Sequence, residues 1–220
     1  MRRNSCQKKK FLCLYVVFIL CIFALTGCAK REIKNINSKG KNIICFGDSL
    51  TFGYGVNPGE DYPSILAKLI NAPVINAGID SDTTSEALKR IKSDVLDRDP
   101  LLVIIELCGN DFLRKIPKQD TINTIKEMIG QIQRKGAMVA IADISAGLFL
   151  REYRSELKNI AREKQAIFIP NILSGIITNP SMKSDFLHPN ADGYKMIAQR
   201  IYRAISPYLE RNAALKKSNQ

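Results

Sequence analysis

Five short apolar segments recur along the chain, separated by longer segments with helical periodicity. They are NIICF (42–46), PVINA (73–77), LLVIIEL (101–107), MVAIADI (138–144) and AIFIP (166–170). Each is rich in β-branched residues and almost continuously apolar, which is typical of a strand buried on both faces of a sheet. We therefore predict five strands.

The segments between the strands place apolar residues three and four positions apart, which predicts amphipathic helices covering the sheet. The clearest stripe is Ile122, Ile125, Ile129 and Ile132. A last helix is expected from about 190 to 210, with residues 211–220 as a frayed tail. Five β-α units with short loops predict an α/β fold with a doubly wound parallel sheet of order 2-1-3-4-5.

The N-terminus has the pattern of an export signal rather than of a folded element. Residues 1–10 hold five basic and no acidic residues, residues 11–25 are all apolar, and LTGC follows at 25–28. A basic segment, an apolar segment of this length and small residues at its end indicate a secretory signal. Leu25-Thr26-Gly27-Cys28 resembles the bacterial lipobox, which implies cleavage after residue 27, a lipid on Cys28 and a membrane-anchored protein on the extracytoplasmic side. The alternative is an uncleaved membrane anchor, because residues 11–29 are nearly long enough to span a bilayer.

Charge and cysteine content narrow the possible partners. The whole chain has a formal net charge of +12; without residues 1–27 it has 28 Lys and Arg against 21 Asp and Glu, a net charge of +7. Basic residues crowd a polar tether at 28–40, which fits either a solvated linker or contact with anionic headgroups. No basic stripe with interleaved aromatic residues follows, which argues against nucleic-acid binding. Cys45 and Cys108 remain in the domain at 41–210, and we expect buried free thiols rather than a disulfide.

Polar and small residues follow each of the first three strands. Gly47-Asp48-Ser49 follows the first strand, Asn76-Ala77-Gly78 ends the second, and Gly109-Asn110-Asp111 follows the third. In the order 2-1-3 these three loops lie side by side at the carboxyl edge, where open α/β sheets bind ligands. Ser49 is then at the centre of the predicted site.

His188 is the single histidine of the chain, and Asp185 precedes it by three residues. A serine becomes a nucleophile when a neighbouring base accepts its proton, and a carboxylate on the far side of the imidazole orients that base. The alternative role of His188 is to cap the last helix. Together with Ser49, however, the pair predicts a Ser-His-Asp site. The backbone N–H groups of Ser49 and Gly78 and the side-chain amide of Asn110 are candidate oxyanion donors, although Gly78 can be a turn glycine and Asn110 a helix cap.

GDSL after the first strand, NAG after the second, GND after the third and DxxHP before the last helix resemble the motifs of the SGNH, or GDSL, hydrolases. The four name-giving residues are matched by Ser49, Gly78, Asn110 and His188. The likeness covers about residues 41–205 and is strongest for the lysophospholipase L1-like, acyl-CoA thioesterase and arylesterase branch. It implies an α/β/α sandwich that hydrolyses esters or thioesters without a metal or cofactor, with Ser49 as nucleophile, His188 as base and Asp185 as its partner.

Two positions depart from the family pattern. Asp80-Ser81 stands where relatives often have Ser-Gly, and Cys108 stands where the third block usually begins with glycine. Asp80 is expected to change the rim of the pocket, and with it the substrate preference. We therefore predict a membrane-anchored serine esterase for small-molecule or lipid esters. The alternatives are a cell-envelope carbohydrate O-acetylesterase and a lipid-anchored small-molecule binding module.

Overall fold

The computed structural model describes residues 32–145 and 150–218. The five predicted strands are all present: β1 (Asn42–Gly47), β2 (Val74–Gly78), β3 (Pro100–Glu106), β4 (Met138–Ala142) and β5 (Ile167–Ile169). They form one parallel sheet in the order β2-β1-β3-β4-β5, as predicted. The helices are α2 (Ser49–Phe52), α3 (Tyr62–Ile70), α4 (Thr84–Asp94), α5 (Gly109–Leu113), α6 (Lys118–Arg134), α7 (Arg151–Glu163) and α8 (Ala191–Ser218), with short 3-10 helices at Leu96–Arg98 and Pro180–Met182.

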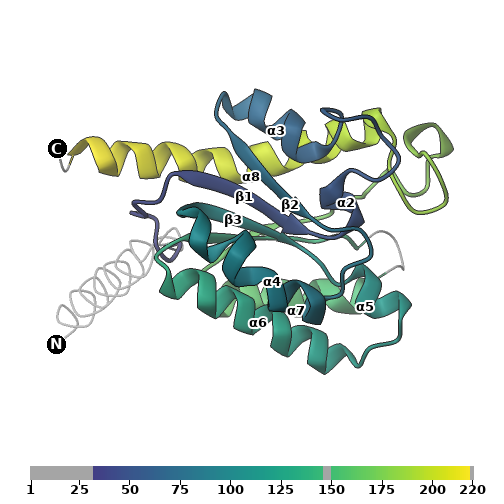
Figure 1. Ribbon diagram of the computed structural model, residues 1–220, viewed down its shortest axis with the longest axis horizontal. Coiled ribbons are helices and arrows are strands. Elements are labelled where there is room, and N and C mark those ends of the chain that lie inside the picture. Colours follow the sequence, from purple (N-terminus) through teal and green to yellow (C-terminus); the bar gives the residue numbers. More distant parts are fainter. Residues whose placement is uncertain (1–31, 146–149, 219–220) are drawn as a thin grey trace, which may run out of the picture. The chain divides into compact units, whose positions relative to one another are not determined.

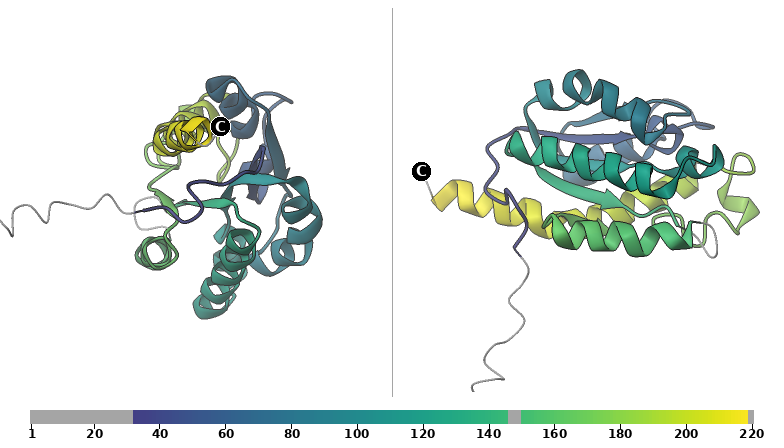
Figure 2. Two further views of the ribbon diagram at one scale, coloured as in Figure 1. Left: turned by 90° about the vertical axis from the view of Figure 1, so that its left-hand side faces the viewer. Right: turned by 90° about the horizontal axis from the view of Figure 1, so that it is seen from below.

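The helices cover the sheet from both sides (Figures 1 and 2). Helices α3 and α8 pack together on one face, and α4, α6 and α7 lie on the other. The predicted stripe of α6 is buried at Ile122, Ile125, Ile129 and Ile132. Strand β4 is buried along its whole length, which explains its unbroken apolar sequence. Among the described residues, no helix combines the length and the apolar character needed to cross a membrane.

The register of the sheet brings the predicted loops together. Gly47 at the end of β1 lies opposite Gly78 at the end of β2 and opposite Glu106 at the end of β3. The chain segments that follow these three residues therefore leave the sheet side by side at its carboxyl edge.

Residues 33–40, which the sequence pattern places in a polar tether, pack against the domain. Ile33 and Ile36 are buried in the core, and the backbone N–H of Lys34 donates to the carbonyl of Gln165. The amide of Asn35 donates to the carbonyls of Gln133 and Ala137. Ala137 directly precedes β4, and Gln165 lies two residues before β5. This segment therefore runs past the amino ends of these two strands.

Helix α8 continues to Ser218, beyond residue 210 where the sequence predicts a frayed tail. The reason is a buried amide: Asn212 donates to the carbonyl oxygens of Ile36 and Ser38 at 2.8 and 3.0 Å. Lys216 adds a hydrogen bond to the carbonyl of Gly40. The N-terminal segment thus holds the last turns of the helix against the domain.

Candidate active site

The turn after β1 fixes Ser49 at a sharp corner. Gly47 ends the strand, and a Cβ atom there would lie 2.0 Å from the Thr51 hydroxyl, so the close approach requires glycine. The Asp48 carboxylate accepts the backbone N–H of Leu50 at 3.1 Å, which caps the short helix α2. Ser49 is the first residue of that helix and is 9% exposed.

The loop before α8 fixes His188 in the same way. Asp185 Oδ1 accepts the backbone N–H groups of Leu187 and His188, both at 2.7 Å. Its other oxygen, Oδ2, lies 2.8 Å from His188 Nδ1. The carboxylate therefore holds Nδ1 as the protonated ring nitrogen and leaves Nε2 as the acceptor. The Tyr54 ring packs on the imidazole with a centroid distance of 4.4 Å.

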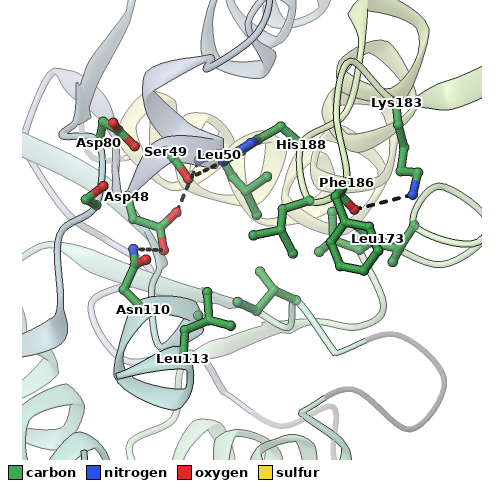
Figure 3. Close-up of a pocket in the computed structure, with 15 residues that line it drawn as sticks. Asp48, Ser49, Leu50, Asp80, Asn110, Leu113, Leu173, Lys183, Phe186 and His188 are labelled. Atoms are coloured by element: carbon green, nitrogen blue, oxygen red, sulfur yellow. Dashed lines mark hydrogen bonds between the residues drawn. The ribbon is translucent and has the colours of Figure 1, made fainter. Parts of the chain in front are cut away.

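The fold joins these two parts, which are 139 residues apart in the chain (Figure 3). His188 Nε2 lies 3.0 Å from Ser49 Oγ. Partial burial raises the pKa of Asp185, but the hydrogen bonds from the His188 ring and from the N–H groups of His188 and Leu187 outweigh it and lower the pKa overall. The carboxylate is thus ionised at neutral pH, and hydrogen bonds connect Ser49, His188 and Asp185 in series.

Asn110, in helix α5, lies beside Ser49 at the same edge of the sheet. Its amide donates to the carbonyl of Asp82 at 2.9 Å and is 3.4 Å from Asp48 Oδ2. Ser81 also lines the pocket, and its backbone is left-handed, with φ 65°. This is a conformation that glycine adopts most easily, which fits the glycine that relatives often have here.

The structure does not bring Gly78 to the pocket. Its N–H donates to the side chain of Asn76 at 2.9 Å, and Gly78 is not among the residues that line the cavity with Ser49. Gly78 has a packing role, because an added Cβ would lie 2.2 Å from the backbone nitrogen of Phe52. Three of the four predicted name-giving residues, Ser49, Asn110 and His188, therefore meet at the pocket.

The cavity beside Ser49 has a volume of about 440 Å³ and two unlike sides. One wall is apolar and includes Leu50, Leu113, Leu173 and Phe186. Ile144, Ile177 and Leu187 also line the cavity. On the other side of Ser49, Asp80 lines the rim. Ser81 also lines the cavity. Phe186 is 84% exposed at the mouth, and Lys183 donates to its carbonyl. The volume is in the range of small-molecule sites.

The family model for the GDSL-like lipase/acylhydrolase family matches residues 45–196. The chain belongs to this family. The arylesterase of Vibrio mimicus is 29% identical over 180 residues, which cover 77% of this chain and 90% of the relative. Thioesterase 1/protease 1/lysophospholipase L1 of Escherichia coli K12 is 26% identical over 179 residues, covering 78% of this chain and 86% of the relative. The crystal structure of AlinE4, an SGNH-hydrolase family esterase, superposes with a TM-score of 0.61 at 30% identity and covers 79% of this chain and 96% of AlinE4.

These relatives and the site geometry identify this GDSL-family chain as a serine ester hydrolase. Cys108, the departure in the third block, has φ 105°, another backbone conformation suited to glycine. Cys45 and Cys108 are both buried free thiols.

Ser81, Tyr54 and Glu106 also contribute to the site or its surroundings, and the sequence pattern did not predict these roles. Glu106 had a signal: it is the acidic residue within the apolar segment LLVIIEL, and it is fully buried. A carboxyl group in a buried strand needs either a hydrogen-bond partner or a proton, so an acidic residue in such a strand indicates a specific role. Ser81 had a partial signal, because Asp80-Ser81 stands where relatives often have Ser-Gly, but its place on the cavity wall depends on the fold. Tyr54 had none, since its ring contact with His188 depends on the fold.

Proposed function

We propose that Ser49 is the nucleophile of this hydrolase, His188 its general base and Asp185 the carboxylate that orients the base. The observation that carries the proposal is the series of contacts from Ser49 Oγ to His188 Nε2, at 3.0 Å, and from His188 Nδ1 to Asp185 Oδ2, at 2.8 Å. This geometry matches the hydrogen-bond reach that activation of a serine requires.

The reaction has two acyl-transfer steps. Ser49 Oγ attacks the ester carbonyl carbon while His188 Nε2 accepts the hydroxyl proton. The tetrahedral intermediate then collapses, and the alcohol or thiol leaves with the proton that His188 returns. Water, deprotonated by His188, attacks the acyl-enzyme and releases the carboxylic acid and free Ser49.

The oxyanion of the intermediate needs donors beside Ser49. We assign this role to the backbone N–H of Ser49 and the side-chain amide of Asn110. The backbone N–H of Ser81 takes the place that the sequence pattern gave to Gly78, because Ser81 lines the pocket and the N–H of Gly78 is bonded to Asn76.

Substitution and covalent labelling test the nucleophile together. Ser49→Ala and His188→Ala are each expected to reduce hydrolysis of a short nitrophenyl ester by at least about 10³-fold, and Ser49→Ala to abolish labelling by a fluorophosphonate. Ser93→Ala, at an exposed serine of α4, is the matched control and should keep both. Undiminished turnover by folded Ser49→Ala would refute the assignment, and an unlabelled wild-type protein would favour a binding module.

We further propose that the apolar wall binds the acyl part of the ester or thioester. Burial of one CH₂ group is worth about 0.8 kcal/mol, so kcat/KM should rise by up to about fourfold per added carbon until the wall is filled. A series from acetyl through butanoyl and octanoyl to dodecanoyl nitrophenyl esters measures this rise. Activity on acetyl esters alone would contradict it and favour carbohydrate deacetylation.

We also propose that the enzyme is a lipoprotein held at a membrane through Cys28, which lies outside the described residues. The support is Leu25-Thr26-Gly27-Cys28 after a basic and then an apolar segment. Mass spectrometry of the membrane fraction should find an acylated N-terminal Cys28. A protein that begins at Met1 would refute cleavage.

A further inference from the structure

Glu106 is a buried carboxyl group directly behind the nucleophile turn. It is the last residue of β3, is fully buried, and lies opposite Gly47 in the sheet register. A Cβ atom on Gly47 would come within 2.8 Å of Glu106 Oε2, so the turn and this carboxyl are in direct contact. The acyl-transfer mechanism does not use Glu106.

Only part of the Glu106 carboxyl is satisfied by neighbouring donors. Oε2 accepts the Thr51 hydroxyl at 2.8 Å, and Thr51 is in turn 2.8 Å from the Tyr62 hydroxyl. Among the described residues, Oε1 has no N–H or hydroxyl donor. Asp48, which is only 3% exposed, also lies against Glu106: both its backbone N–H and its carboxyl contact the Glu106 carboxyl group. Two carboxyl groups can hydrogen-bond to one another only if one of them carries a proton.

The groups around the two carboxyls give them no counter-charge. The ionisable groups that face them are Asp111 from α5, Asp82 from the loop after β2, the Cys45 and Cys108 thiols, and the phenols of Tyr62 in α3 and Tyr194 in α8. Within the described residues no Lys, Arg or His forms an ion pair with Asp48 or Glu106; Arg90 is paired with Asp82 and Asp94. Two ionised carboxylates buried together without a cation would be strongly destabilising.

We propose that Asp48 and Glu106 form an acid pair that holds one proton at neutral pH, and that Glu106 is a positioning residue for the nucleophile turn. In the pair, the protonated Glu106 donates to the Asp48 carboxylate. Asp48 in turn accepts the N–H of Leu50 and lies beside the Asn110 amide, so the pair positions groups on both sides of Ser49.

The direction of both pKa values supports this arrangement. Burial, and then the charge of Asp48, raises the pKa of Glu106 well above its usual range. Burial raises the pKa of Asp48 to about 7, against the lowering effect of the Leu50 N–H and the Glu106 hydrogen bond. Loss of the shared proton at alkaline pH would leave two facing carboxylates and displace Asp48 from the turn. Activity should therefore fall on the alkaline side, although His188 is still able to act as base there.

The proposal rests on Ser49 as the nucleophile for its kinetic test but not for its spectroscopic one. Glu106→Gln can keep the hydrogen bond from Thr51 to its amide oxygen and supply a permanent N–H donor to Asp48. Glu106→Leu removes both bonds. Exposed Glu210→Gln, in α8, is the matched control.

Two measurements decide the proposal. In the pH profile of kcat, the wild type and Glu210→Gln should show an alkaline fall that Glu106→Gln lacks, while Glu106→Leu loses on the order of tenfold or more at every pH. Infrared spectra of the wild type near neutral pH should show the C=O band of a protonated carboxylic acid, and Glu106→Gln should remove it. An alkaline fall retained in Glu106→Gln, or no such band in the wild type, would overturn the proposal. The infrared result stands even if Glu106→Leu fails to fold, and it can be repeated in Ser49→Ala.

Discussion

At the scale of single residues, the His188 imidazole depends on Asp185 for both its tautomer and its orientation. The Asp185 carboxylate makes three hydrogen bonds: to the His188 ring, to the backbone N–H of His188 and to the backbone N–H of Leu187. The loop is short enough that the Asp185 side chain binds both the loop backbone and the His188 ring. Asp185 is therefore part of the structure of the loop as well as of the proposed charge arrangement.

Asp185→Asn should lower kcat by on the order of 10²-fold and change KM little. The amide cannot stabilise an imidazolium, and an N–H facing Nδ1 selects the wrong tautomer. Steady-state kinetics with a nitrophenyl ester measure the effect, with exposed Asp120→Asn in α6 as the control. A kcat equal to that of the wild type would show that Asp185 only shapes the loop.

Asp80 should set the charge preference for the leaving group. Its carboxylate lines the pocket rim on the side of Ser49 away from the apolar wall. With Asp80→Ser, kcat/KM for an anionic acyl-CoA should rise relative to a cationic acylcholine by about two- to fivefold, and high salt should shrink the difference. Exposed Asp97→Ser serves as the control; an unchanged ratio in Asp80→Ser would place the leaving group elsewhere.

At the scale of elements, α8 connects both ends of the domain. Its first turn follows the loop that carries His188, and its last turns pack on residues 36–40 through Asn212 and Lys216. Buried Asn212 donates to the backbone carbonyls of Ile36 and Ser38, which lie outside the strands.

Asn212→Ala should lower the free energy of unfolding by about 1–3 kcal/mol, because two buried carbonyl oxygens lose their donor. Urea denaturation measures the loss, and Lys217→Ala at a neighbouring exposed position should change stability little. Since the contact lies at the amino ends of the strands, kcat/KM should stay close to that of the wild type. A stability equal to that of Lys217→Ala would show that the amide contributes nothing there.

At the scale of the whole molecule, the buried acid pair should give stability a characteristic dependence on pH. The pKa values of Asp48 and Glu106 are raised on folding, so the native state binds more protons than the unfolded chain. Their contribution to stability is therefore complete below about pH 4, and it is lost as the pH rises through the folded pKa values.

The free energy of unfolding of the wild type should thus decrease from about pH 5 to about pH 8, and less steeply so in Glu106→Gln, which has no proton to lose at that position. Urea denaturation across this range gives the slope. The lowered pKa of Asp185 acts in the opposite sense, below about pH 4, and so leaves this window undisturbed. Identical slopes in the two proteins would argue against a shared proton.

The two ends of the sheet have different roles. Ile33 and the segment after it lie at the amino ends of the strands, and the pocket lies at the carboxyl ends. For the proposed lipid on Cys28, we therefore expect no effect on hydrolysis of a soluble ester. Vesicle-bound lipoprotein and lipid-free Cys28→Ser are expected to hydrolyse a soluble ester with the same kcat/KM. A large loss on vesicle binding would mean that the anchor brings the pocket against the lipid.

The sequence by itself determined the strands, the sheet order and the pairing of Ser49 with His188 and Asp185. These follow from signals that are local or periodic: buried strands are apolar throughout, helices repeat every three to four residues, and a single histidine leaves no choice of imidazole.

Only the tertiary structure decided which loop groups face the pocket and which acids meet behind it. Gly78 and Ser81 are three residues apart, and the path of the backbone places Ser81, not Gly78, on the cavity wall. Glu106 and Asp48 meet because β3 pairs with β1. Ile33 and Ile36 are core residues because they pack with the other buried apolar residues of the domain. Such contacts join residues far apart in the chain, so their energies depend on packing and burial, which no local pattern of residues encodes.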